Sequence, residues 1–263
     1  MARFCSLFSS SSGNSTYIGT AGGGILIDAG VSAKRITQAL SDRDIPPESI
    51  KAIFVTHEHS DHIKGIRVFA SKFSIPVFAT EGTLRGLEES GALSGKFPCD
   101  VITPDGVEVC EMIINRFSTP HDSYESCGYT VGMPDGRKIA VATDIGHMTN
   151  EIMTALTGCD LVMIESNHDI GMLQNGDYPY YLKRRILSDT GHLCNEACGD
   201  AVAQLIGRGT TRFFLGHLSE HNNMPDLAYR TSCSALSQQG AVADRDYKLA
   251  VNPPENFDPV IRF

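Results

Sequence analysis

The sequence predicts a fold that mixes helices with short buried strands, of the α/β or the α+β class. Short apolar runs at 25–27, 52–55 and 160–164 have the length of buried strands. Within 63–73, the apolar residues recur near the 3.6-residue period of a helix. The chain of 263 residues contains neither an internal repeat nor a long linker, so we expect a single domain that spans 1–263.

The first part of the chain is expected to combine strands with two helices. Strands are predicted at 4–8, 16–18, 25–27 and 52–55, and the serine-rich segment 9–15 is predicted as a loop. Ser32 is a suitable N-cap for a helix at 33–40. The second helix, at 63–73, would follow the fourth of these strands.

The remainder of the chain is predicted to be rich in strands at first and mixed afterwards. A strand at 76–79 and a helix at 83–89 precede a mostly β region at 99–142, in which Pro134-Asp135-Gly136 indicates a hairpin turn. Beyond this region we expect helices at 150–156, 180–187, 195–206 and 226–238, and strands at 160–164, 212–215 and 247–251.

The composition is that of an ordinary globular chain, with 41% hydrophobic residues. No apolar run approaches the length of a membrane span, and the N-terminus is a poor signal peptide. The eight cysteines form no Cys-x-x-Cys motif, and several lie in apolar runs, as buried thiols do. We therefore expect a cytoplasmic protein without a membrane partner. Cys194 and Cys198 lie one helical turn apart, where packing is favoured over a metal pair.

The charge balance argues against a protein that coats nucleic acid. Subtracting 31 acidic residues from 22 basic ones gives a net charge of −9, whereas generic nucleic-acid binders are basic. An enzyme that engages one strand end is still compatible with this charge, because bound divalent ions would add positive charge at the site.

Metal-binding side chains are concentrated directly after the strand predicted at 52–55. His57, His59, Asp61 and His62 fall within six positions, in a chain that has only nine histidines. Imidazole and carboxylate ligands suit Zn, Mn or Fe at a catalytic site. A solvated polar turn would rarely collect so many ligands, so the cluster predicts a metal centre.

Further candidate ligands stand at the ends of other apolar runs. His121, Asp144 and His217 each follow such a run, and Asp28 closes the run at 25–27. The order of these residues resembles the metallo-β-lactamase superfamily, whose signature is His-x-His-x-Asp-His followed by a distant His, Asp and His. The resemblance implies an α+β, four-layer αββα sandwich. The interval from Asp144 to His217 is 217 − 144 = 73 residues, too short for the β-CASP insertion of larger nuclease relatives.

The resemblance also implies how the ligands are shared between two divalent metal ions, Zn or Mn, with Fe as a further choice. It assigns one ion to His57, His59 and His121, the other to Asp61, His62 and His217, and a bridging role to Asp144. Such a pair activates a water as hydroxide. Asp28 would orient a ligand imidazole or cap the end of its strand.

A narrower resemblance, to the YycJ/WalJ-like group of small nucleases, covers the chain from its N-terminus to about residue 223. The segments that carry it are Leu7–Ser15, Ser166–Asp169, Leu187–Leu193 and Gly216–Asn223. It implies a 5′→3′ DNA exonuclease implicated in mismatch repair, with DNA and repair proteins as partners.

Several polar residues in these segments are candidate substrate contacts. Ser12, Asn14, Ser219, Asn222 and Asn223 are predicted to contact phosphate, and His168 and His192 to act catalytically beside Asp61 and Asp144. Each has a structural alternative, such as a helix cap for Ser219 and a hydrogen-bonded core residue for either histidine. The basic run 183–185 would contact phosphate or form a solvated helix face.

Two other functions remain open at this stage. The same metals would serve a hydrolase of a small molecule, such as a cyclic phosphodiester, lactone or thioester. A metal-stabilised scaffold that recruits partners is the non-enzymatic alternative, and the complete ligand set argues against it.

Overall fold

The computed structural model describes residues 1–263 as two mixed β-sheets packed face to face. The first sheet has, in spatial order, β14 (Ile261–Arg262), β1 (Arg3–Ser10), β2 (Gly13–Thr20), β3 (Gly23–Ile27), β4 (Ile50–Phe54), β5 (Val77–Ala79) and β6 (Cys99–Val101). The second has β13 (Lys248–Val251), β12 (Arg212–Gly216), β11 (Leu161–Glu165), β10 (Lys138–Ala142), β9 (Cys127–Gly132), β8 (Met112–Ser118) and β7 (Val107–Val109).

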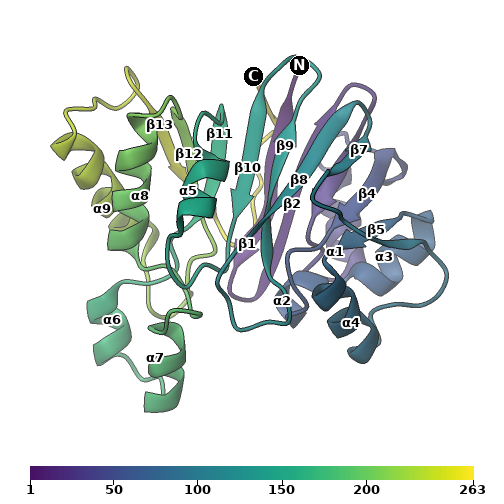
Figure 1. Ribbon diagram of the computed structural model, residues 1–263, viewed down its shortest axis with the longest axis horizontal. Helices are drawn as coiled ribbons and strands as arrows, with labels where there is room; N and C mark the ends of the chain where they lie inside the picture. The colour runs from purple at the N-terminus through teal and green to yellow at the C-terminus, as the bar shows by residue number, and fades with distance from the viewer.

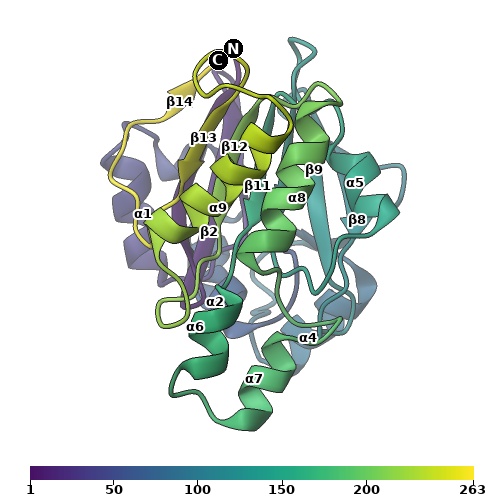
Figure 2. The ribbon, with the colours of Figure 1, turned by 90° about the vertical axis from the view of Figure 1, so that its left-hand side faces the viewer.

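Helices cover the outer faces of both sheets (Figures 1 and 2). Those on the side of the first sheet are α1 (Ala33–Ser41), α2 (Ser60–Ile63), α3 (Ile66–Phe73) and α4 (Glu81–Glu89), with a 3₁₀ turn at Pro47–Ser49. Those on the side of the second are α5 (Asn150–Leu156), α6 (Ile170–Asn175), α7 (Tyr180–Ile186), α8 (Asn195–Ile206) and α9 (Pro225–Gln238). None of them combines the length and apolar composition that a membrane span requires.

Three apolar clusters hold the layers together. One lies between the sheets and contains Phe54 and Tyr129, whose ring centroids are 5.6 Å apart. The other two lie under the helices, with Phe69 of α3 in one and Val202 of α8 in the other. Each sheet is therefore buried on both faces, and the predicted α+β sandwich of four layers is confirmed.

Some predicted elements differ in detail from the observed ones. The helix expected at 63–73 is broken into α2 and α3, because the N–H of Gly65 donates to Ala29 in the loop after β3. Within the mostly β region expected at 99–142, β7 and β8 form a hairpin that turns at Cys110 and Glu111 with positive φ. The serine-rich segment 9–15 is largely strand, because Ser9 and Ser10 of β1 pair with β2.

The sequence analysis predicts neither α6 nor β14, whereas β6 lies within the region expected to be mostly β. Helix α6 and the predicted α7 form a lobe at one edge of the sandwich, opposite the two chain termini (Figure 1). The strands β3, β4, β10 and β12 are followed at that same edge by the candidate metal ligands and Asp28. The interval between Asp144 and His217 holds α5 to α8 with β11 and β12, and it contains no inserted domain.

Candidate metal centre

Strand ends deliver the candidate residues to one edge between the two sheets. Asp28 follows β3, and Asp144 and His217 follow β10 and β12, with φ values of 62°, 59° and 54° respectively. This left-handed backbone is uncommon for residues other than glycine and is concentrated at functional sites. It turns the chain sharply as each strand ends. Gly30 allows the loop after β3 to pack closely here, since a Cβ at Gly30 would lie 1.6 Å from the carbonyl oxygen of Asp61.

Three imidazoles form a first group of candidate ligands. Nδ1 of His59 lies 3.0 Å from Nε2 of His57 and 3.2 Å from Nε2 of His121. One ring nitrogen from each residue therefore points to a common position, as a three-histidine metal site requires.

A second group combines a carboxylate with two imidazoles. Oδ2 of Asp61 lies 3.3 Å from Nε2 of His62 and 3.8 Å from Nε2 of His217. Asp144 lies between the two groups: its Oδ2 is 3.3 Å from Nε2 of His62, and its Oδ1 is 3.9 Å from Nε2 of His57. One carboxylate thus presents an oxygen to each group, which fits the bridging role that the family resemblance implies.

Hydrogen bonds behind the ligands fix the orientation of their rings. Nδ1 of His62 donates to Oδ2 of Asp28, whose carboxylate also accepts the N–H and the hydroxyl of Thr56. Nδ1 of His121 donates to the carbonyl of Gly191 at 3.0 Å. Each bond leaves Nε2 of its ring directed at the cluster, which is the arrangement common around metal sites. Burial would lower the pKa of His62, but the Asp144 and Asp28 carboxylates raise it well above its usual range, so a metal bound here would displace a proton from this ring.

The electrostatics of the cluster favour a deprotonated carboxylate. Burial alone would raise the pKa of Asp144, but the rings of His217 and His62 hold it well below its usual range. Burial lowers the pKa of His217, but the Asp144 carboxylate outweighs this and raises it to about 9. Burial and the neighbouring His62 hold the pKa of His57 well below its usual range. The Asp144 carboxylate and the His57 ring are thus buried acceptors that suit a divalent cation, whereas a cation at His217 would have to displace a proton from its ring.

Glu165 is a residue of the site that our sequence analysis missed. It is fully buried at the end of β11. Its carboxylate accepts Nδ1 of His192 at 2.8 Å and the backbone N–H groups of Ile145 and Leu193. Together with Asp144, His192 and His217 it forms a further group whose ligand atoms converge. The available signal was a carboxylate closing an apolar strand, the same pattern that selected Asp28.

The two histidines predicted to be catalytic lie in different surroundings. His192 lines the cavity of about 220 Å³ that contains Asp61, Asp144 and His217. His168 does not line this cavity and lies instead beside a second one, which it shares with His192. Neither ring nitrogen of His168 has a hydrogen-bond partner.

The predicted phosphate contacts are distributed unevenly around the site. Ser219 lines the metal cavity, while Asn14 is buried with its amide 3.1 Å from Nε2 of His62. Ser12 is exposed, does not line the cavity and donates to Glu220. Asn222 is buried, and its side-chain nitrogen has no partner. Asn223 uses its amide to join Ser166, Asn167 and Asn195, which leaves no hydrogen free for a phosphate.

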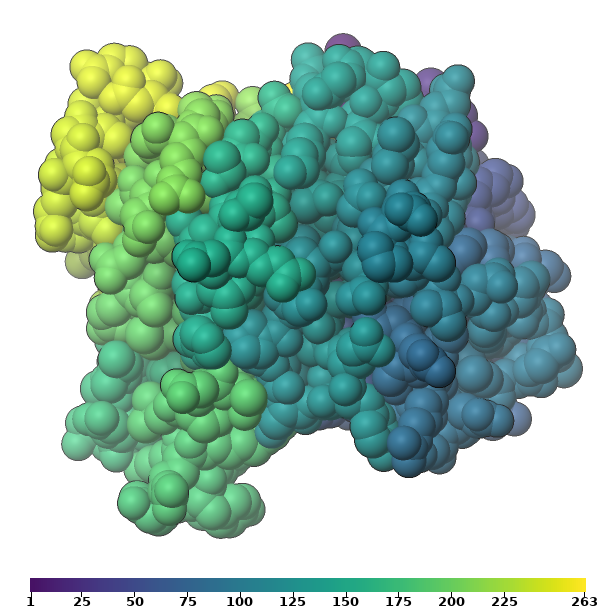
Figure 3. Space-filling view, in the orientation of Figure 1, coloured from purple at the N-terminus to yellow at the C-terminus, as the bar shows by residue number.

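The basic run lies on α7, in a lobe that extends below the rest of the molecule at the lower left of Figure 3. The ammonium group of Lys183 donates to the carbonyls of Gln174 and Gly176 and so ties α7 to the preceding segment. Arg185 forms a bidentate pair with Asp122, beside His121, and also lines the metal cavity. Arg184 remains exposed over the ring of Tyr180.

The two neighbouring cysteines are not part of a metal site. The sulfur of Cys194 caps α8 by accepting the N–H of Ala197. Burial raises the pKa of Cys198 to about 12, so its thiol keeps its proton. The packing role that the sequence favoured is confirmed by these contacts.

Comparisons with known proteins agree with this geometry. A family model described as a beta-lactamase superfamily domain matches residues 24–218. Exodeoxyribonuclease WalJ of Streptococcus pneumoniae serotype 2 is 35% identical over 98% of this chain and 97% of its own length. Exodeoxyribonuclease YycJ of Bacillus anthracis is 37% identical over 96% of each chain. The crystal structure of the metallo-beta-lactamase fold protein YhfI from Bacillus subtilis has a TM-score of 0.73 at 12% identity and covers 97% of this chain and 98% of its own.

Proposed function

We propose that this chain, which belongs to the metallo-β-lactamase superfamily and to its group of YycJ- and WalJ-like proteins, is a metal-dependent 5′→3′ exodeoxyribonuclease. The relatives that carry the exodeoxyribonuclease name are aligned over nearly their whole length and nearly the whole of this chain.

The observation that carries the proposal is the position of Asp144 between the two groups of ligands. Its two oxygens face His62 on one side and His57 on the other. This donor set fits two divalent ions, for which we propose Zn or Mn, with Fe as a further choice. Ions held here supply charge neutralisation at a phosphoryl oxygen and lower the pKa of a bound water. Repair proteins as partners stay a prediction from the resemblance.

The side chains around the ligands have separate tasks in this proposal. Asp28 and the Gly191 carbonyl hold the rings of His62 and His121 in one tautomer. Glu165 holds a proton on Nδ1 of His192, whose ring lines the metal cavity. His192 is thus oriented so that Nε2, when it also carries a proton, can donate it to a phosphoryl or leaving-group oxygen. Ser219 offers a hydroxyl in the same cavity.

The lobe formed by α6 and α7 favours a nucleic-acid substrate over a small molecule. Tyr180 and Tyr181 are 76% and 75% exposed, next to residues of α7 that line the metal cavity. Exposed aromatic rings beside a cation are the usual platform for stacking single-stranded bases, and Arg184 provides that cation here. The α7 segment carries three basic residues and no acid in a chain of net charge −9.

The test is the digestion of single-stranded oligonucleotides labelled at either end, with Mn²⁺ or Zn²⁺ added. We expect a 5′ label to appear at once in a mononucleotide and a 3′ label to appear in a ladder of shortening strands. Asp144→Asn should lower the rate by at least about 100-fold, because the variant loses a ligand charge. An Asp226→Asn variant, which removes an exposed acid at the start of α9, is the control. Intact strands with a metal-loaded wild-type protein would refute the proposal.

The second candidate is a hydrolase of a small molecule, and one observation favours it. A cavity of about 490 Å³ lies next to the metal cavity and has the size of a small-ligand site. The two functions differ in how the rate depends on strand length. A nuclease that uses the α7 lobe should act faster on strands of several nucleotides than on a dinucleotide, whereas a small-molecule enzyme should show no such gain.

A further inference from the structure

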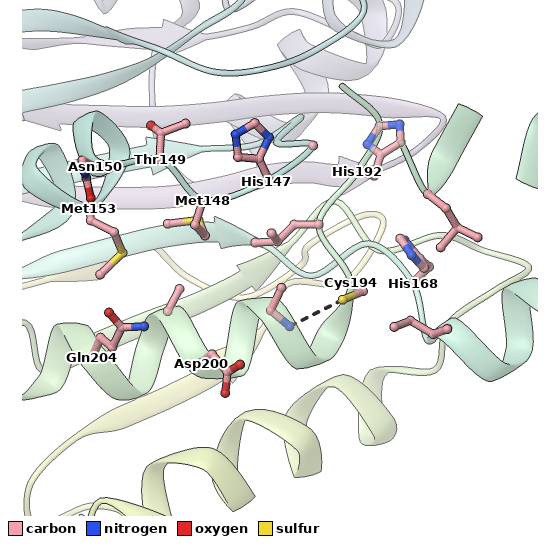
Figure 4. Close-up of a pocket in the computed structure, with 16 residues that line it drawn as sticks. His147, Met148, Thr149, Asn150, Met153, His168, His192, Cys194, Asp200 and Gln204 are labelled. Atoms are coloured by element: carbon pink, nitrogen blue, oxygen red, sulfur yellow. Dashed lines mark hydrogen bonds between the residues drawn. The ribbon is translucent and has the colours of Figure 1, made fainter. Parts of the chain in front are cut away.

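The second cavity, which we call the α8 cavity, lies between α8 and the loop after β10. Figure 4 shows His147, Met148, Thr149 and Asn150 along one side, residues of α8 along the other, and His168 and His192 towards one end. His192 lines both this cavity and the metal cavity, and its Nδ1 lies 3.8 Å from Oδ1 of Asp144. A ligand in the α8 cavity would therefore lie next to the reacting group.

The lining of the α8 cavity excludes a phosphate and favours an uncharged, partly apolar group. It contains neither lysine nor arginine, and its one carboxylate belongs to Asp200. Half of its sixteen residues are hydrophobic, among them Met148, Met153 and Leu193. The amide groups of Asn150 and Gln204 stand at its exposed rim. Apolar walls with a few amide groups suit a planar heterocycle whose edge forms hydrogen bonds.

His168 supplies the second, independent observation. Its side chain lines the α8 cavity and is only 1% exposed, and both of its ring nitrogens lack a hydrogen-bond partner. A buried polar group without a partner is costly, and such groups in folded proteins call for an explanation. Burial lowers the pKa of His168 to about 4, so the ring is neutral near pH 7 and offers one donor and one acceptor. Because the two nitrogens point away from each other, one of them can pair with a group on the edge of a nucleobase, which presents both donors and acceptors.

We propose that the α8 cavity binds the nucleobase of the strand-terminal nucleotide, with His168 as its hydrogen-bond partner, while the scissile phosphate lies in the metal cavity. The inference rests on the proposed nuclease function, since that function makes the terminal base the group next to the reacting phosphate. The proposal separates the two parts of the substrate by their chemistry. The anionic phosphate would bind at the metal cavity, where bound cations attract it, and the uncharged base would bind in the partly apolar α8 cavity behind His192.

The first experiment measures binding without any phosphate. Deoxyadenosine and thymidine are titrated into the metal-loaded protein and followed by saturation-transfer NMR, with 2-deoxyribose as the baseless control. We expect both nucleosides to bind and the sugar not to bind. His168→Leu should weaken nucleoside binding by about threefold to tenfold, the worth of one neutral hydrogen bond. Ala197→Leu, which fills the cavity from α8, should abolish it, whereas Ala235→Leu, the same change on α9 outside the cavity, should leave it intact.

The second experiment measures base recognition during turnover. Strands with an ordinary 5′-terminal nucleotide are compared with strands whose terminal residue is abasic, and the ratio of kcat/KM is taken for each variant. We expect the wild-type ratio to favour the base at least about tenfold, and Ala197→Leu to bring the ratio close to one. Because the ratio is taken within one preparation, a partial loss of folded or metal-loaded protein cancels.

The outcomes separate the two proposals. Cleavage of both strands at equal rates, with no nucleoside binding, overturns the base-binding cavity and leaves the nuclease intact. Nucleoside binding that depends on His168, in a protein that cleaves no strand, overturns the nuclease and leaves the cavity as a base-binding site.

Discussion

Asp28 shows at the scale of one residue how the site depends on groups that touch no substrate. Its carboxylate accepts hydrogen bonds from His62 and from the backbone and hydroxyl of Thr56, and its φ is 62°. Removing the carboxylate therefore has two separable consequences. It frees the His62 ring to rotate, and it leaves a buried N–H of Thr56 without a partner.

We predict that Asp28→Ala lowers metal affinity by about 10- to 100-fold and the free energy of unfolding by about 1–3 kcal/mol. Calorimetric metal titration and urea unfolding measure the two effects. Asp44→Ala is the matched control, because Asp44 also has a left-handed φ, 54°, but its side chain is exposed and forms no hydrogen bond with a candidate ligand. Asp44→Ala should show only the small loss in the free energy of unfolding that comes from placing alanine at a left-handed φ. Equal metal affinities of the two variants would contradict the orienting role.

His168 provides a prediction about pH at the same scale. Burial lowers its pKa to about 4 in the folded protein, against about 6.5 in the unfolded chain. Between these values the unfolded state binds more protons than the folded state, so this residue makes stability fall as the pH falls from 6.5 to 4. Above pH 6.5 it contributes no pH dependence, and below 4 its contribution changes no further.

We therefore expect His168→Leu to flatten the pH profile of unfolding between pH 4 and 6.5 in chelator-treated protein. The difference between variant and wild type is at most about 3 kcal/mol across this window. Urea unfolding at several pH values measures it. His168→Gln introduces a second side chain that does not titrate and should give the same flattening. Agreement between the two variants would show that the effect comes from the lost titration and not from altered packing. Parallel profiles for wild type and both variants would show that His168 does not titrate in this way.

The candidate ligands could be selected from the sequence, whereas much of what surrounds them could not. Histidine is a rare residue type in this chain, and His57, His59 and His121 follow apolar runs. Both their ligand chemistry and their position at strand ends can therefore be recognised in the sequence. The role of Glu165 depends on contacts with Ile145 and Leu193, which lie 20 and 28 residues away. Contacts of that range are set by the packing of strands and loops, which no local pattern reports.

At the scale of secondary-structure elements, α7 is the feature whose function is easiest to test. Lys183 and Arg185 form hydrogen bonds within the protein. The side chains of α7 that remain free to bind a substrate are therefore the exposed tyrosines and Arg184. Stacking on aromatic rings contributes about 1–3 kcal/mol per base and tolerates any sequence. The helix should therefore bind a single strand without sequence specificity.

We predict that replacing Tyr180 and Tyr181 together with alanine weakens binding of a single-stranded oligonucleotide by at least about tenfold. Fluorescence anisotropy with a catalytically inactive Asp144→Asn background measures this. Phe257→Ala, at a residue that is 79% exposed in the C-terminal segment, removes a comparable ring and should have no effect. Arg184→Ala should also reduce the dependence of binding on salt. Unchanged binding in the double variant would exclude α7 as the platform.

The elements themselves were predicted well where their pattern is local and poorly where tertiary contacts decide. Ser32 does cap α1, since its hydroxyl accepts the N–H of Arg35 as the sequence predicts. The break between α2 and α3 depends on Gly65 packing against the loop after β3, and a Cβ there would lie 2.3 Å from the carbonyl oxygen of Val31. The helical periodicity of the apolar residues in 63–73 does not indicate that contact.

At the scale of the whole molecule, the site joins the two halves of the sandwich. His57, His59, Asp61 and His62 follow β4 of the first sheet, and His121, Asp144 and His217 follow β8, β10 and β12 of the second. The pairing of these halves was accessible from the sequence only through the family resemblance, because strand spacing alone does not say which strands share a sheet. A ligand bound at this position contacts both sheets, and neither half can unfold without releasing it.

Metal binding should therefore stabilise the entire fold and not only the loops at its edge. A ligand that binds the folded state alone adds about 2.7 kcal/mol when its free concentration is 100 times Kd. For a chain of this size that corresponds to a rise in Tm of about 5–10 °C. Differential scanning calorimetry before and after treatment with a chelator, and again after Zn²⁺ or Mn²⁺ is restored, measures the shift. Asp144→Asn, which removes the charge between the two groups, should lose most of it. A Tm that stays within about 1 °C in the presence and absence of metal, while metal-dependent activity persists, would mean that the two sheets are held together by their apolar contacts alone.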